Sequence, residues 1–360
     1  MLERLLNLSN RAVLLILGAL VVVPVMVSLL VHLTRPAPNF TEWLEGFLLN
    51  FSTEMLGAIV TFALLYLIVE HREKRLEEQK EESKLKARLI REMGSPDNAT
   101  ALNAVRELRA HGWLENGTLQ GANLIEANLQ GANLEGVNLQ RANLTAANLL
   151  EANLNRANLQ KAQMRDANLQ KAKLEEADLR KAFLAGVDMR EAYLAHTNLE
   201  GAYLFKAKLT GIYLFDVNLQ GAILGLSSMQ QAYLVKVNLR GADLAHVNLH
   251  EAELGHADLQ ETRMEGVNLS GAHLHSAKVT DNQLAIASSL RGATMPDGRR
   301  YDGRFNLWGD IRTARRGHID TDNPEAIMAE WYGISLDEYQ HGQEWARENL
   351  PRLRREEGEG

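Results

Sequence analysis

Three tyrosines, Tyr193, Tyr213 and Tyr233, recur at a spacing of twenty residues in the second half of the chain. Phe183 and Tyr203 recur at the same spacing, ten residues out of phase with them. Aromatic side chains of this kind are favoured at the centres of protein interfaces. We therefore take these five residues as candidates for partner binding. The alternative is that stacked aromatics only support neighbouring strands.

Glu54 directly precedes an apolar run at residues 55–69, which reaches spanning length by recruiting residues 47–53 on its N-terminal side. An acid inside a membrane span is by default a candidate for function, in transport or sensing. The alternative, which we favour, is that the helix enters the bilayer later and Glu54 lies at the headgroup level.

Residues 291–316 carry seven arginines against three aspartates, a surplus of four positive charges. Such a segment could contact anionic lipid, RNA or an acidic partner. Without a pattern of interleaved aromatic residues or a known nucleic-acid motif, we favour a solvated face. The candidates for contact with an anionic surface are Arg299, Arg300, Arg304, Arg312, Arg315 and Arg316.

Nothing else in the sequence assembles a nucleophile, a base and an orienting group, and there is no glycine-rich phosphate loop. The chain has no cysteine, which excludes disulfides and thiolate metal sites. His196 and His256 share a face but lie three coils apart on the repeat described below, too far for one metal ion. We expect no catalytic, cofactor or metal site.

The N-terminal 69 residues are expected to form a two-helix transmembrane hairpin. Residues 12–33 form an apolar run of spanning length, too long for a signal peptide and without a following cleavage site. Residues 55–69 form the second run. Lys and Arg flank both outer ends, whereas the loop at residues 34–46 contains only Arg35. This places both termini in the cytoplasm and predicts a multi-pass protein of the bacterial inner membrane.

A charged stretch follows at residues 70–93, with favourable i,i+4 pairs such as Glu70 with Lys74. It predicts a helical stalk continuous with the second span. Ser95 is expected to cap a further helix with Pro96 at its first position, ending at Gly112. Residues 70–117 would thus form a cytoplasmic stalk and N-terminal cap.

From Leu119 to Val279 every fifth residue is Leu, Met or Val, and the residue two before it is small, usually Ala. Neither a helix nor a strand keeps a face at a period of five, so the pattern indicates stacked units.

The motif A-[N/D]-L-x-x, as in "GANLIEANLQGANLE" at residues 121–135, resembles the pentapeptide-repeat proteins. The resemblance implies a mainly β fold, a right-handed quadrilateral parallel β-helix with four pentapeptides per coil. It covers residues 118–280 and puts residues 20 apart on one face. Residues 281–360 are expected to add a C-terminal cap, with Thr280 as an N-cap, and a small helical tail with caps at Asn323 and Ser335.

Some members of this family resemble DNA and bind topoisomerases, which requires a strongly acidic rod. Residues 118–280 hold 17 acidic and 15 basic side chains, so this alternative is weak here. The expected function is a non-enzymatic, membrane-anchored scaffold whose rod presents a surface to an unidentified protein partner. A homo-oligomer is a further candidate assembly, and nucleic acid is not an expected partner. A sensing or transport role through the hairpin is the remaining alternative.

Overall fold

The computed structural model describes residues 40–305, 307–317 and 324–349, together with residues 19, 23, 26, 27, 30 and 34. Its chain divides into two compact units, Met1–Leu85 and Lys86–Gly360. The helices are α3 (Phe40–Met93), α4 (Asn98–Ala110), α5 (Asp281–Leu284), α6 (Trp308–Gly317), α7 (Pro324–Tyr332) and α8 (Leu336–Asn349).

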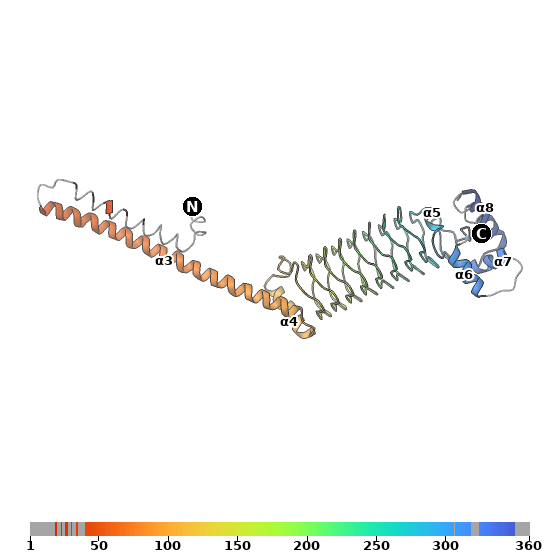
Figure 1. The fold of residues 1–360 in the computed structure, drawn as a ribbon, viewed down its shortest axis with the longest axis horizontal. Helices are drawn as coiled ribbons and strands as arrows, with labels where there is room; N and C mark the ends of the chain where they lie inside the picture. The colour runs from red at the N-terminus through yellow and green to blue at the C-terminus, as the bar shows by residue number, and fades with distance from the viewer. Residues whose placement is uncertain are drawn as a thin grey trace. The chain divides into compact units, whose positions relative to one another are not determined.

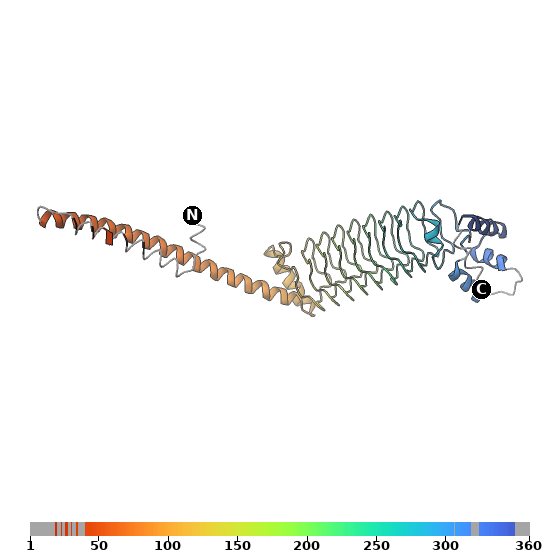
Figure 2. The ribbon, with the colours of Figure 1, turned by 45° about the horizontal axis from the view of Figure 1, so that its top comes forward.

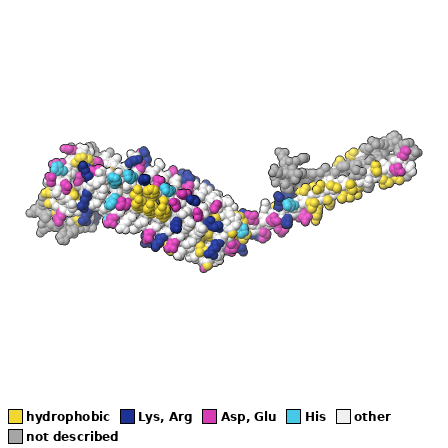
Figure 3. All heavy atoms as spheres, turned by 180° about the vertical axis from the view of Figure 1, so that it is seen from behind, with side chains coloured by type: hydrophobic (Ala, Val, Ile, Leu, Met, Phe, Trp, Pro, Cys, Tyr) yellow, Lys and Arg dark blue, Asp and Glu magenta, His cyan; other side chains and the backbone are white. Residues whose placement is uncertain are grey.

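Helix α3 is continuous over 54 residues, so the predicted second span and its charged stalk form one helix. Its apolar stretch within Met55–Met93 is long and apolar enough to cross a membrane, and the side chains there are exposed. Figure 3 shows hydrophobic side chains along the described part of this helix. It is the one helix of that kind among the described residues.

One expectation about this region changes. Helix α3 begins at Phe40, so residues 40–46 are helical rather than part of a connecting loop. The segment of α3 contains no proline, and Glu42 stands in its first turn, where it complements the helix dipole. The predicted first span lies outside the described residues, apart from five helical positions.

The second unit is dominated by a stack of coils built from isolated parallel bridges, which Figures 1 and 2 show as regular turns between α4 and α5. The bridges run from Asn123↔Asn143 to Asp258↔Lys278, always at a spacing of 20 residues. Four pentapeptides therefore make one coil, as the family resemblance implied, and four bridge ladders form four walls.

Each pentapeptide places its residues in a fixed order. In residues 122–126, Ala122 and Leu124 point inward and are buried, whereas Asn123 between them points outward. Residues 125 and 126 turn the corner, and Glu126 adopts a left-handed conformation with φ 56°. Non-glycine residues at this second corner position have φ between 54° and 62° along the stack. The N–H of Glu126 donates to Thr145 O at 2.9 Å, so a bond to the next coil offsets the unfavourable conformation.

The outward asparagines explain the preference for Asn at that position. Asn148 Oδ1 accepts from the N–H of Leu150, closing a local turn, and Asn148 Nδ2 donates to Asn128 Oδ1 at 3.0 Å. Asn168 continues the ladder with a bond of 3.2 Å to Asn148. One amide side chain thus satisfies its own corner and links two coils.

Helix α4 covers the N-terminal end of the stack. It is capped by Asp97, whose carboxylate accepts from the N–H of Thr100 at 2.8 Å, and not by Ser95 as expected. Ser95 instead lies two residues before the cap, and its carbonyl accepts from Asn128 N–H in the first coil. The helix ends at Ala110 with His111 as C-cap, before Gly112, which has φ 68°.

The C-terminal end continues past the predicted boundary at residue 280. Thr280 forms a capping box with Gln283 that opens α5, as predicted. Bridges Asn268↔Ser289 and His273↔Thr294 then add a partial coil whose spacing is one residue longer than before. Helix α7 begins at Pro324, and Ser335 caps α8 through reciprocal bonds with Glu338, as predicted. Asn323, the predicted cap of α7, lies outside the described residues.

Candidate functional site

The tyrosine strip (Tyr193, Tyr213, Tyr233) lies on one wall of the coil stack. Its rings stack on each other, with centroids 4.7 Å apart in each pair and interplanar angles of 9° and 1°. The strands hold them at this spacing because all three are consecutive bridge partners in one ladder. Tyr193 is 40% exposed, and the other two are partly exposed.

The strip is bounded by charged residues on its own ladder, Lys173 before it and Glu253 after it. Phe215 extends the apolar surface at the neighbouring corner, and Lys236 Nζ lies 5.5 Å from its ring centroid. Burial of the phenol and the neighbouring tyrosines raise the pKa of Tyr213. The strip is therefore a flat, neutral aromatic surface inside a charged border.

The phenylalanine strip (Phe183, Tyr203, Ile223) lies on the opposite wall. Phe183 and Tyr203 have ring centroids 5.7 Å apart and are tilted by 36°. The ring centroid of Phe205, at the adjoining corner, lies 6.1 Å from that of Tyr203. The sequence pattern did not predict this contact, because only the residue before each Leu was assigned to a ladder. Figure 3 shows an apolar patch in the middle of the stack, ringed by charged side chains.

Acidic residues in the other two ladders are paired locally. Asp188 accepts from Arg190 at 2.9 and 2.8 Å, and Lys208 lies 4.0 Å away in the next coil. Partial burial alone would raise the pKa of Asp188, but these hydrogen bonds and the Lys208 charge outweigh it, so the pKa is lowered. Asp178 and Arg180 repeat the arrangement. The walls are therefore mixed in charge rather than uniformly acidic.

The arginines of the tail do not form one solvated face. Arg304 pairs with Asp302 and lies over the ring of Trp345 at 4.5 Å. Arg312 lies 5.1 Å from the centroid of Trp308, which is 71% exposed. Two of these arginines thus contact tryptophan rings, Arg304 a ring from α8 and Arg312 a ring on its own helix α6.

Among the remaining arginine candidates, Arg299 and Arg300 are exposed. Arg315 and Arg316 belong to α6, and their side chains lie outside the described part of the structure. Glu54 lies in α3, and its side chain is likewise not described.

The histidine rings of the stack do not converge on a metal site. His256 and His275 are neighbours in adjacent coils, with centroids 5.7 Å apart and rings nearly perpendicular. Over the described residues, no group of three or more His, Cys, Asp or Glu side chains is placed to hold a metal ion.

Comparison with known proteins supports the repeat assignment. A protein-family model described as pentapeptide repeats matches the chain in eight copies, over residues 110–141, 138–175, 172–211, 212–250 and 248–281. A search of curated proteins gave no match.

Several solved structures are similar to the repeat region. HetL, a pentapeptide repeat protein involved in heterocyst differentiation regulation from the cyanobacterium Nostoc sp. strain PCC 7120, is 30% identical. The match covers 55% of this chain and 98% of HetL, with a TM-score of 0.24. QnrB1, a plasmid-mediated fluoroquinolone resistance protein, in a trypsin-treated form, is 15% identical over 56% of this chain and 89% of its own, with a TM-score of 0.35.

A pentapeptide repeat protein of the Arabidopsis thaliana thylakoid lumen is 27% identical over 32% of this chain and 73% of its own, with a TM-score of 0.14. The family match agrees with the twenty-residue coil that the bridges show. The chain belongs to the pentapeptide-repeat family, and its coil stack is a right-handed quadrilateral β-helix.

Proposed function

We propose that this protein is a non-enzymatic scaffold that a membrane anchor holds at the bacterial inner membrane, and that it docks a protein partner on the tyrosine strip. The observation that carries the proposal is the strip itself. Three nearly parallel stacked rings, with neighbouring centroids 4.7 Å apart, form a continuous aromatic surface within a wall that is otherwise polar. Such a surface gives a partner a large, rigid contact area at little cost in side-chain entropy.

The strip is a better docking candidate than the phenylalanine strip because its rings are parallel and bounded by charges of both signs. Charged residues at the edge of an apolar centre help to fix the orientation of a partner. In the proposal, Lys173 and Glu253 supply this edge at the two ends of the ladder.

The docking test compares partner recovery by the wild type and by a variant with Tyr193, Tyr213 and Tyr233 all changed to Ser. A matched control changes Asn198, Asn218 and Asn238 to Ser, because these residues occupy the same three coils on the next wall. All three proteins are purified from solubilised membranes with their bound partners, and their melting temperatures are recorded. Loss of a partner from the tyrosine variant alone supports docking, and an unchanged partner set in a folded variant contradicts it.

The anchor is argued from α3, whose apolar side chains between residues 55 and 68 are exposed in the described structure. Exposed apolar surface of this length is costly in water and favourable in a bilayer. In the proposed topology both termini and the β-helix are cytoplasmic, and residue 35 lies on the far side.

The topology can be tested with single cysteines, because the chain has none of its own. Arg35→Cys should react with a membrane-impermeant maleimide in intact spheroplasts, and Arg72→Cys should react only after lysis. The reverse pattern, or labelling of both before lysis, would contradict the proposed orientation. Recovery of the wild type in the soluble fraction would contradict the anchor itself.

Two other functions receive less support. A topoisomerase-binding DNA mimic needs an acidic wall, and the paired acids Asp178 and Asp188 show that the charges here are locally balanced. Sensing or transport through Glu54 predicts that Glu54→Gln changes a flux or a response, whereas the scaffold predicts no change.

A further inference from the structure

A cavity of about 580 Å³ lies where the last coils of the β-helix meet α6 and α7. Its wall includes Arg291 and Arg300, with His250, Ser270 and Thr313 as further polar groups and Trp331 as the aromatic one. The volume is within the range of pockets that hold small metabolites. The pentapeptide pattern of the sequence does not predict a cavity at this position.

Arg291 is held rigidly at this cavity. Its guanidinium carbon lies 3.8 Å from the centroid of the Trp331 ring, and its Nε donates to Trp331 O at 3.0 Å. Among the described residues, neither of its terminal Nη atoms has a hydrogen-bond or ion-pair partner. A stacked guanidinium with a fixed Nε and two open Nη donors is preorganised for an oxyanion.

Arg300 supplies the second positive charge. Its guanidinium lies beside Gly333, where a Cβ would be 3.3 Å from Arg300 Nη2. Within the described part of the chain, no carboxylate lies within ion-pair distance of Arg300. Both arginines lie near the end of α7, so the structural alternative is that they only stabilise its C-terminal carbonyls. Stabilising the carbonyls of α7 uses only Nε of Arg291, so the other guanidinium donors of Arg291 and Arg300 remain available to a ligand.

The one acid in the wall, Asp310, does not neutralise these charges by direct pairing. Its carboxylate accepts hydrogen bonds from Ser289 Oγ, from Leu290 N–H at 3.2 Å and from Tyr332 Oη at 3.1 Å. Burial raises the pKa of Asp310, although these hydrogen bonds oppose the increase. Its side chain is thus engaged in holding α6 and α7 to the partial coil, and the open donors in the cavity are those of the arginines.

We propose that this cavity binds a phosphate-bearing small molecule, with Arg291 and Arg300 as its anion ligands. Two guanidinium charges match the charge of close to −2 that a phosphate monoester carries at neutral pH, whereas one carboxylate carries only −1. The hydroxyls of Ser270 and Thr313 and the Trp331 ring line the rest of the volume, where the organic part of the ligand would lie. This site is independent of the tyrosine strip and does not rest on the scaffold function.

The experiment is calorimetric titration of the full-length protein in detergent with inorganic pyrophosphate, accompanied by melting curves. We expect saturable binding at one site per chain. Arg291→Gln and Arg300→Gln should each weaken it by about tenfold or more, as expected for loss of a charged hydrogen-bond donor. Arg299→Gln is the matched control, because Arg299 adjoins Arg300 in sequence but lies outside the cavity and is 85% exposed. It should stay within about twofold of the wild type.

Arg291→Gln also removes the contact with Trp331, so a lower melting temperature would leave its result ambiguous. Arg300→Gln avoids this, because no hydrogen bond or ion pair of its side chain is lost among the described residues. Absence of saturable binding to the wild type would overturn the proposal, as would an equal loss in the Arg299 control. Binding of citrate without binding of pyrophosphate would also overturn it, in favour of a carboxylate ligand. Binding of dihexanoyl phosphatidic acid in addition to pyrophosphate would support the phosphate site and identify a lipid headgroup as one source of the phosphate.

Discussion

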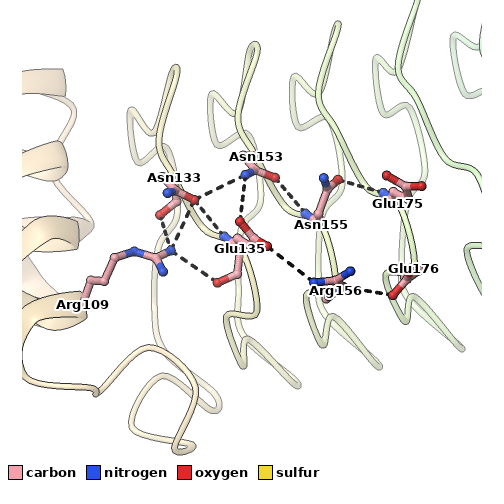
Figure 4. A network of polar contacts seen from close by, with 8 residues as sticks. All are labelled: Arg109, Asn133, Glu135, Asn153, Asn155, Arg156, Glu175 and Glu176. Atoms are coloured by element: carbon pink, nitrogen blue, oxygen red, sulfur yellow. Dashed lines mark hydrogen bonds and ion pairs between the residues drawn. The ribbon is translucent and has the colours of Figure 1, made fainter.

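Arg109 and Asn133 show how the open end of the β-helix is closed. Nη2 of Arg109 donates to the carbonyl oxygen of Asn133 at 2.9 Å and to that of Glu135 at 3.3 Å (Figure 4). One coil further on, the equivalent carbonyl of Asn153 accepts from the N–H of Leu134 at 2.7 Å. The side chain of Arg109 therefore takes the place of a coil that does not exist.

Asn98, at the other end of α4, does the same for the adjacent wall. Its Nδ2 donates to the carbonyls of Asn128 and Gln130, each at 3.1 Å. A short helix thus supplies side-chain donors to four carbonyls that would otherwise stand open at the edge of a parallel ladder. Open ladder edges of this kind promote end-to-end association.

The first prediction concerns this cap. Arg109→Met should remove the donor for two carbonyls and destabilise the first coil by about 1–3 kcal/mol. Because each coil of a solenoid contacts only the coils next to it, amide hydrogen exchange should accelerate in residues 119–140 and stay unchanged near residue 240. Arg106→Met is the control, since Arg106 bonds Asn103 on its own helix. Equal acceleration in both variants, or none in either, would show that Arg109 is not part of the cap.

The second prediction separates wall support from docking in the tyrosine strip. Tyr213 stacks on two rings, whereas Tyr193 and Tyr233 each stack on one member of the strip. If stacking stabilises the wall, Tyr213→Ser should lower the melting temperature by roughly twice as much as Tyr193→Ser. Thermal melts of the single variants measure this. Melting temperatures that do not depend on the position in the strip would argue that the rings contribute little to folding.

The third prediction concerns Ser227, which replaces the usual inward Ala of the repeat. Its Oγ is buried without a hydrogen-bond partner in the described structure. Ser227→Ala should therefore stabilise the protein by about 1–2 kcal/mol, because a desolvated hydroxyl is removed. Thr197 is the matched contrast, since its buried Oγ1 donates to Leu174 O at 2.7 Å.

For the contrast, Thr197→Val should destabilise the protein by about 1 kcal/mol through the lost hydrogen bond. Denaturant unfolding of both variants gives the two signs directly. Destabilisation by Ser227→Ala would indicate that the hydroxyl has a partner in solution, such as a bound water.

The fourth prediction follows from the lowered pKa of Asp188. An acid whose folded pKa lies below its unfolded value of about 3.9 contributes stability that is fully present above that value. The contribution is lost as the pH falls through the folded pKa. The wild type should therefore melt above Asp188→Asn at pH 6, and the difference should shrink as the pH is lowered from 4 to 2. A difference that stays constant over this range would show that the Arg190 pair does not stabilise the ionised carboxylate.

Much of the candidate site could be predicted from the sequence, because in a strictly periodic fold residues a fixed number of positions apart lie on the same wall. Counting by twenty placed the three tyrosines in one ladder and Phe183 with Tyr203 in another, as the bridges confirm. It missed Phe205, because corner residues do not form bridges and their direction depends on the local turn. It also gave no aromatic partners for the arginines, because these partners lie up to 41 residues away in sequence, as for Arg304 and Trp345.

The sequence by itself determined that the units stack and at what period the inward residues recur, and the family resemblance implied how many units make one coil and where the walls run. A five-residue period buries the inward Leu and Ala of each unit, and the backbone groups are satisfied by bonds to the coils on either side and by local turns such as Ala127 N–H to Leu124 O. The tertiary structure alone decided how the ends are closed by Arg109 and Asn98, and how Arg291 and Arg300 meet at one cavity. These residues belong to no repeat, so their positions depend on how separate helices pack against the coils, and packing between non-periodic segments has no signature in local sequence.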